Sequence, residues 1–126
     1  MTGMHTTPRT GDDPIFAAID THRETVGNAD RANERLTAAG PDGDWRPTHA
    51  ALVAEIAAAK ALIGTAPTTH AGLRALEEYL RRNDHVSRGI ERTVTTDGGY
   101  TYKTFGGPEA VDWLIAKRAA EIAEGL

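Results

Sequence analysis

Alanine is the residue that most constrains how this chain can fold. Of its 126 residues, 50 are apolar, and 21 of these are Ala whereas only 20 are Ile, Leu or Val. Because an alanine side chain buries little surface, a core of this composition is thin and depends on helices that approach each other closely. The composition therefore favours tightly packed helices, and it predicts that further apolar surface is buried by self-association.

The first periodic segment predicts a long helix that begins after Asp13. The Asp13 carboxylate can cap the helix, and Pro14 suits the first turn because its missing N–H group is not needed there. The segment GPDGD at 40–44 ends the pattern. Residues on one face recur at steps of four and three, as in helices that pack lengthwise. These residues are Ile15, Ile19, His22, Val26, Ala29, Asn33 and Leu36.

Two further helices are predicted in the middle of the chain. The first follows Arg46-Pro47 and ends at Gly64. The turn TAPTT at 65–69 then offers Thr68 or Thr69 as the cap of the second, which ends near Asn83 and Asp84. The stripes expected to be buried are Leu52, Ile56, Ala59 and Ile63 with Val53 beside them, and then Leu73, Leu76 and Leu80 with Tyr79 alongside.

A β-hairpin is predicted before the last helix. Residues 91–105 alternate β-branched and aromatic side chains around Asp97-Gly98-Gly99, which tolerates the positive φ of a tight turn. Gly106-Gly107-Pro108 then starts the final helix. Its expected buried stripe is Val111, Ile115, Ala119 and Ile122, flanked by Leu114.

The predicted fold class is therefore mainly α. We expect a small bundle of about four helices with a β-hairpin inserted before the C-terminal helix. Residues 13–126 are predicted to form a single helical domain. Residues 1–12 show no periodicity and are predicted to be a disordered tail.

Two segments resemble short uncharacterised bacterial helical proteins. DPIFAAIDTHR at 13–23 is similar to their DPIF-type first helix, and TAPTTHAGLRALEEYL at 65–80 is similar to their TT-x-AG-x-x-AL helix. The resemblance covers 27 residues and departs from the group at the hairpin and the final helix. It implies a bacterial cytoplasmic setting and a helical start, and it brings no activity with it.

The common sequence patterns of catalytic and cofactor sites do not occur. Neither G-x-x-x-x-G-K-[ST] nor G-x-G-x-x-G is present, and the chain has no Cys. No two of the five His are three or four residues apart, so no single helix turn presents a pair of metal ligands. We therefore predict no catalytic, cofactor-binding or metal-binding residues. An enzyme whose site is assembled from distant residues would leave no such pattern, and it is the third functional hypothesis.

The segment at about 48–83 supports an alternative hypothesis, a DNA-binding regulator. Two helices joined by a turn resemble a helix-turn-helix unit, and they would place Thr68, Thr69, His70 and Arg74 near the start of a recognition helix. The net charge of residues 45–83 is only +2, and the whole chain carries −4. This charge favours neither nucleic acid nor an anionic membrane as a partner. No stretch approaches the roughly 18 apolar residues of a membrane span, and we expect a cytoplasmic protein.

Polar residues on the first helical stripe point to self-association. His22 and Asn33 occupy stripe positions, where polar side chains cost stability but can determine register and partner number. They either form hydrogen bonds inside their own bundle or face the same helix of a second chain. Both alternatives follow from the pattern.

Three aromatic residues near the end of the chain form a second candidate contact. Trp113 lies about 200° around the last helix from Val111, opposite the expected buried stripe. Tyr100 and Tyr102, two apart, share one face of a strand. These three rings either pack on one another internally or form an exposed anchor cluster. The leading hypothesis is a non-enzymatic interaction or regulatory module that forms a homo-oligomer and binds an unidentified protein partner, with no cofactor.

Overall fold

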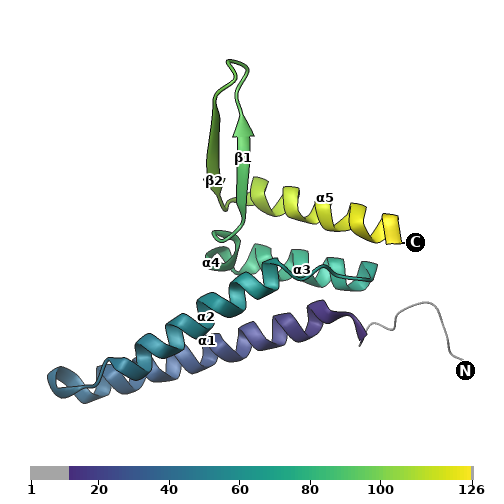
Figure 1. Cartoon of the computed structure of the whole chain (residues 1–126). Helices are drawn as coiled ribbons and strands as arrows, with labels where there is room; N and C mark the ends of the chain where they lie inside the picture. The colour runs from purple at the N-terminus through teal and green to yellow at the C-terminus, as the bar shows by residue number, and fades with distance from the viewer. Residues whose placement is uncertain (1–11, 126) are drawn as a thin grey trace, which may run out of the picture.

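The computed structural model describes residues 12–125 and confirms a mainly helical fold with a β-hairpin before the last helix (Figure 1). Of the predicted tail at 1–12, all but Asp12 lies outside the described residues. One short helix, α4, adds to the four that the sequence predicts. The elements are α1 (Pro14–Ala39), the 3₁₀ helix η3 (Gly40–Asp42), α2 (Arg46–Ile63), α3 (His70–Arg82), α4 (Asp84–Ser87), β1 (Glu91–Thr95), β2 (Thr101–Phe105) and α5 (Pro108–Gly125).

Helices α1 and α2 form a long antiparallel hairpin whose far end extends away from the other helices (Figure 1). Asp13 caps α1 as predicted, because its carboxylate accepts a hydrogen bond of 3.1 Å from the Ile15 N–H group. Gly40 ends α1 with a φ of 68°, a left-handed conformation that glycine adopts without steric cost. The turn through η3 then returns the chain along α1.

Small residues fill the contact between α1 and α2. Ala29 and Ala32 of α1 are buried, as are Thr48 and Ala58 of α2, and the Thr48 hydroxyl donates a 3.2 Å hydrogen bond to the Ala32 carbonyl oxygen. Alanine lets two helix backbones approach closely, so little apolar volume separates them. The long hairpin consequently has a thin interior.

This close approach corrects the predicted burial of α2 and places Asn33 outside the bundle of its own chain. Asn33 is exposed, because Ala32 takes the buried position of that turn of α1. On α2, Leu52 and Ile56 are also exposed, whereas the sequence predicts them to be buried. The sequence offers α2 two apolar stripes, and the one with the smaller side chains faces α1.

The larger side chains form the core at the opposite end of the hairpin, where α1, α2, α3 and α5 converge. Helix α3 packs against α1 on one side and against α5 on the other. The core consists of Ile15, Ile19, Leu62, Leu76, Tyr79, Leu80, Val86, Ile90, Ala110, Val111 and Leu114.

The β-hairpin projects from this core (Figure 1). Its strands pair antiparallel, with Glu91 opposite Phe105 and Thr95 opposite Thr101. At the base, the Gly106 N–H group donates to the Ile90 carbonyl oxygen at 3.1 Å. Gly106 has a φ of 72°, and a Cβ there would lie 2.9 Å from the Cα of Arg88, so the base of the hairpin requires glycine.

Helix α5 buries a stripe that is rotated slightly from the predicted one. Ile115 and Ala119 are half-buried, whereas Leu114 and Arg118 are buried. Arg118 extends to the end of α2, where its guanidinium donates to the Ile63 carbonyl oxygen at 2.6 Å and to Glu121 at 2.8 Å. A charged side chain takes a buried position here because it satisfies a carbonyl group at a helix C-terminus.

Candidate functional site

A polar cluster lies between α1, α2, α3 and α4. Its centre is His22 of α1, which is completely buried. The Nδ1 atom of His22 lies 2.6 Å from the Tyr79 hydroxyl of α3. On its other side the His22 ring lies 5.5 Å from the ring of His85 in α4, and Glu55 of α2 completes the group. His22, Glu55 and His85 are hereafter called the triad.

The triad brings three possible ligand groups close together. The His85 Nε2 atom lies 3.5 Å from a Glu55 carboxylate oxygen, and one ligand atom from each residue lies within 4.8 Å of the other two. The Nε2 atom of His22 is buried and has no hydrogen-bond partner among the residues that the structure describes. Side-chain exposure rises from 19% at Glu55 to 48% at His85, so the cluster opens to solvent on the α4 side.

Burial and neighbouring charge shift two pKa values in the cluster. The pKa of His22 is lowered below 6.5, mainly because burial disfavours the charged imidazolium and also because His85 is close, with Glu55 opposing the shift. Burial raises the pKa of the Tyr79 hydroxyl, and the nearby Arg23 opposes this shift. His22 and Tyr79 are therefore both favoured in their neutral forms at neutral pH.

The lowered pKa of His22 predicts a loss of stability in acid. Unfolded His22 gains a proton near pH 6.5, whereas folded His22 does so only at lower pH, so protons favour the unfolded state as the pH falls below 6.5. Urea denaturation between pH 8 and pH 5 should show this loss. The His22→Gln variant should lose this part of the pH dependence, and the matched control His70→Gln, at an exposed histidine, should retain it.

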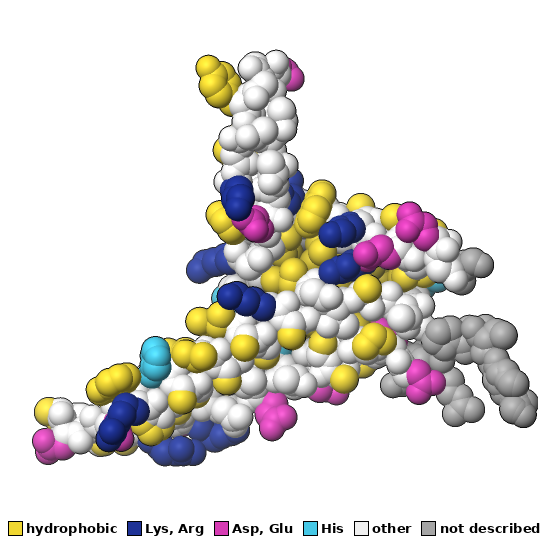
Figure 2. All heavy atoms as spheres, viewed as in Figure 1, with side chains coloured by type: hydrophobic (Ala, Val, Ile, Leu, Met, Phe, Trp, Pro, Cys, Tyr) yellow, Lys and Arg dark blue, Asp and Glu magenta, His cyan; other side chains and the backbone are white. Residues whose placement is uncertain are grey.

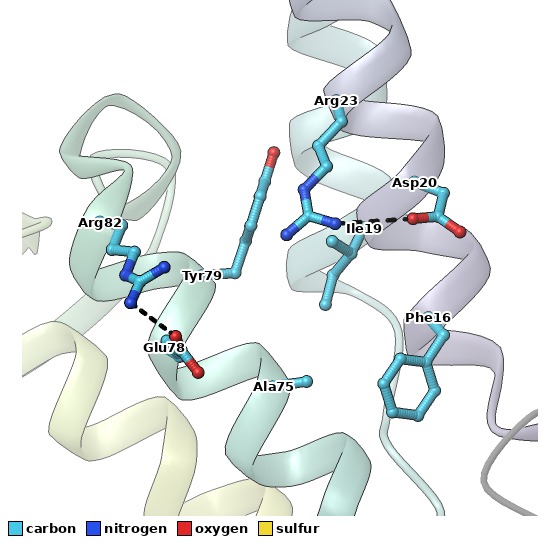
Figure 3. Close-up of a pocket in the computed structure, with 8 residues that line it drawn as sticks. All are labelled: Phe16, Ile19, Asp20, Arg23, Ala75, Glu78, Tyr79 and Arg82. Atoms are coloured by element: carbon cyan, nitrogen blue, oxygen red, sulfur yellow. Dashed lines mark ion pairs between the residues drawn. The ribbon is translucent and has the colours of Figure 1, made fainter.

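A shallow groove of about 180 Å³ between α1 and α3 reaches the Tyr79 ring (Figure 3). The Arg23 guanidinium lies 5.2 Å above this ring, near enough for a cation–π contact. Arg23 pairs with Asp20 at 3.7 Å, and Arg82 pairs with Glu78 at 2.8 Å. Because each arginine has an acidic partner on its own helix, the groove is charge-balanced.

The outer face of α2 carries large apolar side chains that no other part of the described chain, residues 12–125, covers. Trp45, Leu52, Val53 and Ile56 are all exposed, and the Trp45 ring meets the His49 ring edge-on at 5.7 Å. Hydrophobic side chains follow the length of the α1–α2 hairpin in Figure 2. Trp45, His49, Leu52 and Ile56 recur at steps of four, three and four, the spacing of a helix that packs lengthwise against another. These four residues and Val53 are hereafter called the α2 face.

The three residues of the predicted aromatic cluster are all exposed. Tyr100 precedes β2 at the end of the hairpin farthest from the core, Tyr102 lies within β2, and Trp113 lies on α5. The Trp113 ring has the Lys117 ammonium at 5.3 Å, and among the described residues no aromatic pair joins it to a tyrosine. The role of these three residues and of the exposed Asn33 in partner binding stays a prediction.

The residues proposed for DNA contact divide into two groups. His70 and Arg74 are exposed at the start of α3. Thr68 and Thr69 instead direct their donors toward Asp13, whose Oδ2 atom accepts from both backbone N–H groups at 3.0 Å and from the Thr69 hydroxyl at 2.7 Å. A protein carboxylate thus occupies the position that a DNA phosphate would take at this helix start.

Asp13 also connects the starts of two helices that are far apart in the sequence. It belongs to DPIF at the start of α1, and its partners belong to the TT-x-AG segment at the start of α3. A single carboxylate therefore caps α1 and also binds Thr69, the residue that caps α3.

Glu55 and His85 are functional candidates that sequence reasoning missed. They lie 33 and 63 residues from His22, so neither falls within a helix turn of it. The one available signal was the polar His22 on an otherwise apolar stripe of α1, which indicated a buried partner without identifying it.

Searches with the chain find no matching family model, no matching curated protein and no matching solved structure. Within residues 12–125, none of the helices combines the length and the apolar character needed to cross a membrane.

Proposed function

We propose that this protein is a self-associating interaction module, in which the α2 face of one copy packs against the same face of a second. The observation that carries this proposal is the arrangement of residues 45–58, where the large side chains point outward while small ones fill the contact of α2 with α1. Large apolar side chains gathered on one surface are typical of a protein–protein contact. Self-association is also the leading hypothesis from the sequence, but here α2 forms the contact instead of the polar stripe of α1 or the three aromatic residues.

A second copy suits this face better than another class of partner. Two α1–α2 hairpins placed face to face would form a four-helix arrangement, which encloses the apolar stripes that one hairpin leaves open. A two-fold contact needs only one self-complementary surface. Helix α2 has only three charged residues, and one of them, Glu55, lies beside His22 and His85. Few charged groups would therefore lose their hydration when two copies associate. If the α2 face instead binds a helix of an unrelated protein, the isolated chain should stay monomeric in the test below.

The test is Ile56→Asp, examined by sedimentation equilibrium. We expect the unaltered protein to dimerise and the variant to bind itself at least about 100-fold more weakly, because a carboxylate would be buried unpaired in the contact. Phe105→Asp is the matched control, since Phe105 on the hairpin is 61% exposed and Ile56 is 58% exposed. The control should dimerise like the unaltered protein.

Two results would contradict this proposal. The first is a monomer at high micromolar concentration, which would leave the α2 face to a different protein. The second is loss of self-association in Trp113→Ala with no loss in Ile56→Asp, which would move the contact to α5. Circular dichroism should show that each variant retains its helices, so that a folding defect is not counted as an association defect.

A further inference from the structure

We infer that the triad is a binding site for a divalent transition-metal ion of the zinc type. This site is separate from the α2 face and does not depend on self-association. Two imidazole nitrogens and one carboxylate oxygen form a donor set that Zn²⁺, Co²⁺ and Fe²⁺ accept. Three different helices supply the three residues, so the folded chain creates the site.

The spacing of the triad is close to that of metal ligands. Two ligand atoms on one tetrahedral Zn²⁺ ion are about 3.3 Å apart, given bonds of about 2.0–2.1 Å. The His85 Nε2 atom and the Glu55 carboxylate oxygen lie 3.5 Å apart, and the whole set falls within 4.8 Å. Closing the set around an ion requires movement of up to about 1.5 Å, and His85 is free to make it because nearly half of its side chain is exposed.

The second, independent observation is the unpartnered nitrogen of His22. Its Nε2 atom is buried without a hydrogen bond to any described residue, an arrangement that lowers stability when nothing satisfies the atom. Tyr79 already engages Nδ1 at 2.6 Å, so Nε2 is the atom left for a further partner. A hydrogen bond at one ring nitrogen is the usual way in which a protein orients a metal-ligating histidine.

The exposed side of the triad gives the ion a route in and leaves room for an exogenous ligand. His22 lies at the closed end and His85 at the open end. Three protein ligands with an open position distinguish an exchangeable or reactive site from a closed structural one, and water would fill that position. The ion would also hold α4 against α1 and α2, and α4 leads directly into the β-hairpin.

Metal binding is tested on the untagged chain, first treated with a chelator and then titrated with Zn²⁺ by calorimetry. We expect one ion per chain with a Kd of about 1 μM or tighter, and a Tm that rises with added Zn²⁺. A parallel titration with Co²⁺ should produce visible absorption bands whose intensity reports the coordination number.

The decisive variant is His85→Ala, because an exposed side chain can be removed with little effect on folding. It should bind Zn²⁺ at least about 30-fold more weakly and lose the metal-dependent rise in Tm. Glu55→Gln, which keeps the shape of the side chain, should show the same direction of change. The matched control His70→Ala, at an exposed histidine outside both the triad and the α2 face, should bind like the unaltered protein.

Two outcomes would overturn the inference. One is a Kd for Zn²⁺ weaker than about 100 μM in the unaltered chain. The other is equal binding by His85→Ala and the unaltered chain, which would mean that the ion lies elsewhere. Neither outcome affects the self-association proposal, which is measured in the presence of a chelator.

Discussion

Replacing Asp13 by alanine should lower the free energy of unfolding by about 3–5 kcal/mol, a large share of the stability of a domain this small. The carboxylate is almost completely buried at the point where the starts of α1 and α3 meet. Its loss would leave four donors without their acceptor: the N–H groups of Ile15, Thr68 and Thr69 and the Thr69 hydroxyl. Each buried donor that loses its partner costs about 1–3 kcal/mol where water cannot reach it.

Urea denaturation, followed by circular dichroism, measures this effect. Asp44→Ala is the matched control, because Asp44 also accepts a hydrogen bond from a backbone N–H group at a helix start, that of Arg46 at 3.0 Å. Asp44 serves only its own helix and is exposed, so its loss should cost clearly less than that of Asp13. Equal losses in the two variants would show that Asp13 is an ordinary cap and that its contact with α3 adds no stability.

Asp13 also illustrates which part of this fold could be predicted from the sequence. Its role at the start of α1 is a local signal, read from Asp-Pro followed by a periodic segment, and the structure confirms it. Thr69 as the cap of α3 and the hairpin around residues 97–99 are equally local, and both are confirmed. The contact between Asp13 and Thr69 spans 56 residues, and no pattern within either segment predicts it.

The two faces of α2 show a different limit. The sequence gives this helix two apolar stripes, one of small residues through Ala58 and one of large residues through Ile56. Hydrophobicity alone assigns the larger residues to the interior. The close packing of α1 on α2 reverses this assignment. Because Ala32 of α1 is small, the two helix backbones lie close together, and no room is left between them for the larger side chains of α2. The same packing displaces Asn33 to the surface.

The triad could not be predicted from the sequence for a third reason. Metal-site patterns depend on short spacings within one helix or loop, whereas His22, Glu55 and His85 come from three separate elements. Their proximity follows from how α1, α2 and α4 cross, which depends on the whole core. The sequence could place His22 on the buried stripe of α1 but could not identify the residues it would meet.

Gly72→Ala should destabilise the protein by about 3 kcal/mol, although alanine is normally the better helix former. Gly72 lies in the first turn of α3, directly beneath the Asp13 carboxylate. A Cβ at this position would overlap that carboxylate and lie 2.9 Å from the Ile15 Cγ2 atom. The added methyl group must therefore push α3 away from α1 and lengthen the hydrogen bonds that Asp13 makes.

Gly27, in the middle of α1, provides the control of opposite sign. A Cβ at Gly27 in α1 would meet only the flexible end of the Arg31 side chain, at 3.4 Å, so Gly27→Ala should stabilise the protein by up to about 1 kcal/mol. The double variant Asp13→Ala/Gly72→Ala should lose at least about 1 kcal/mol less than the two single losses added together, because the overlapping carboxylate is then absent. Strict additivity would mean that Gly72 is needed for some reason other than its closeness to Asp13.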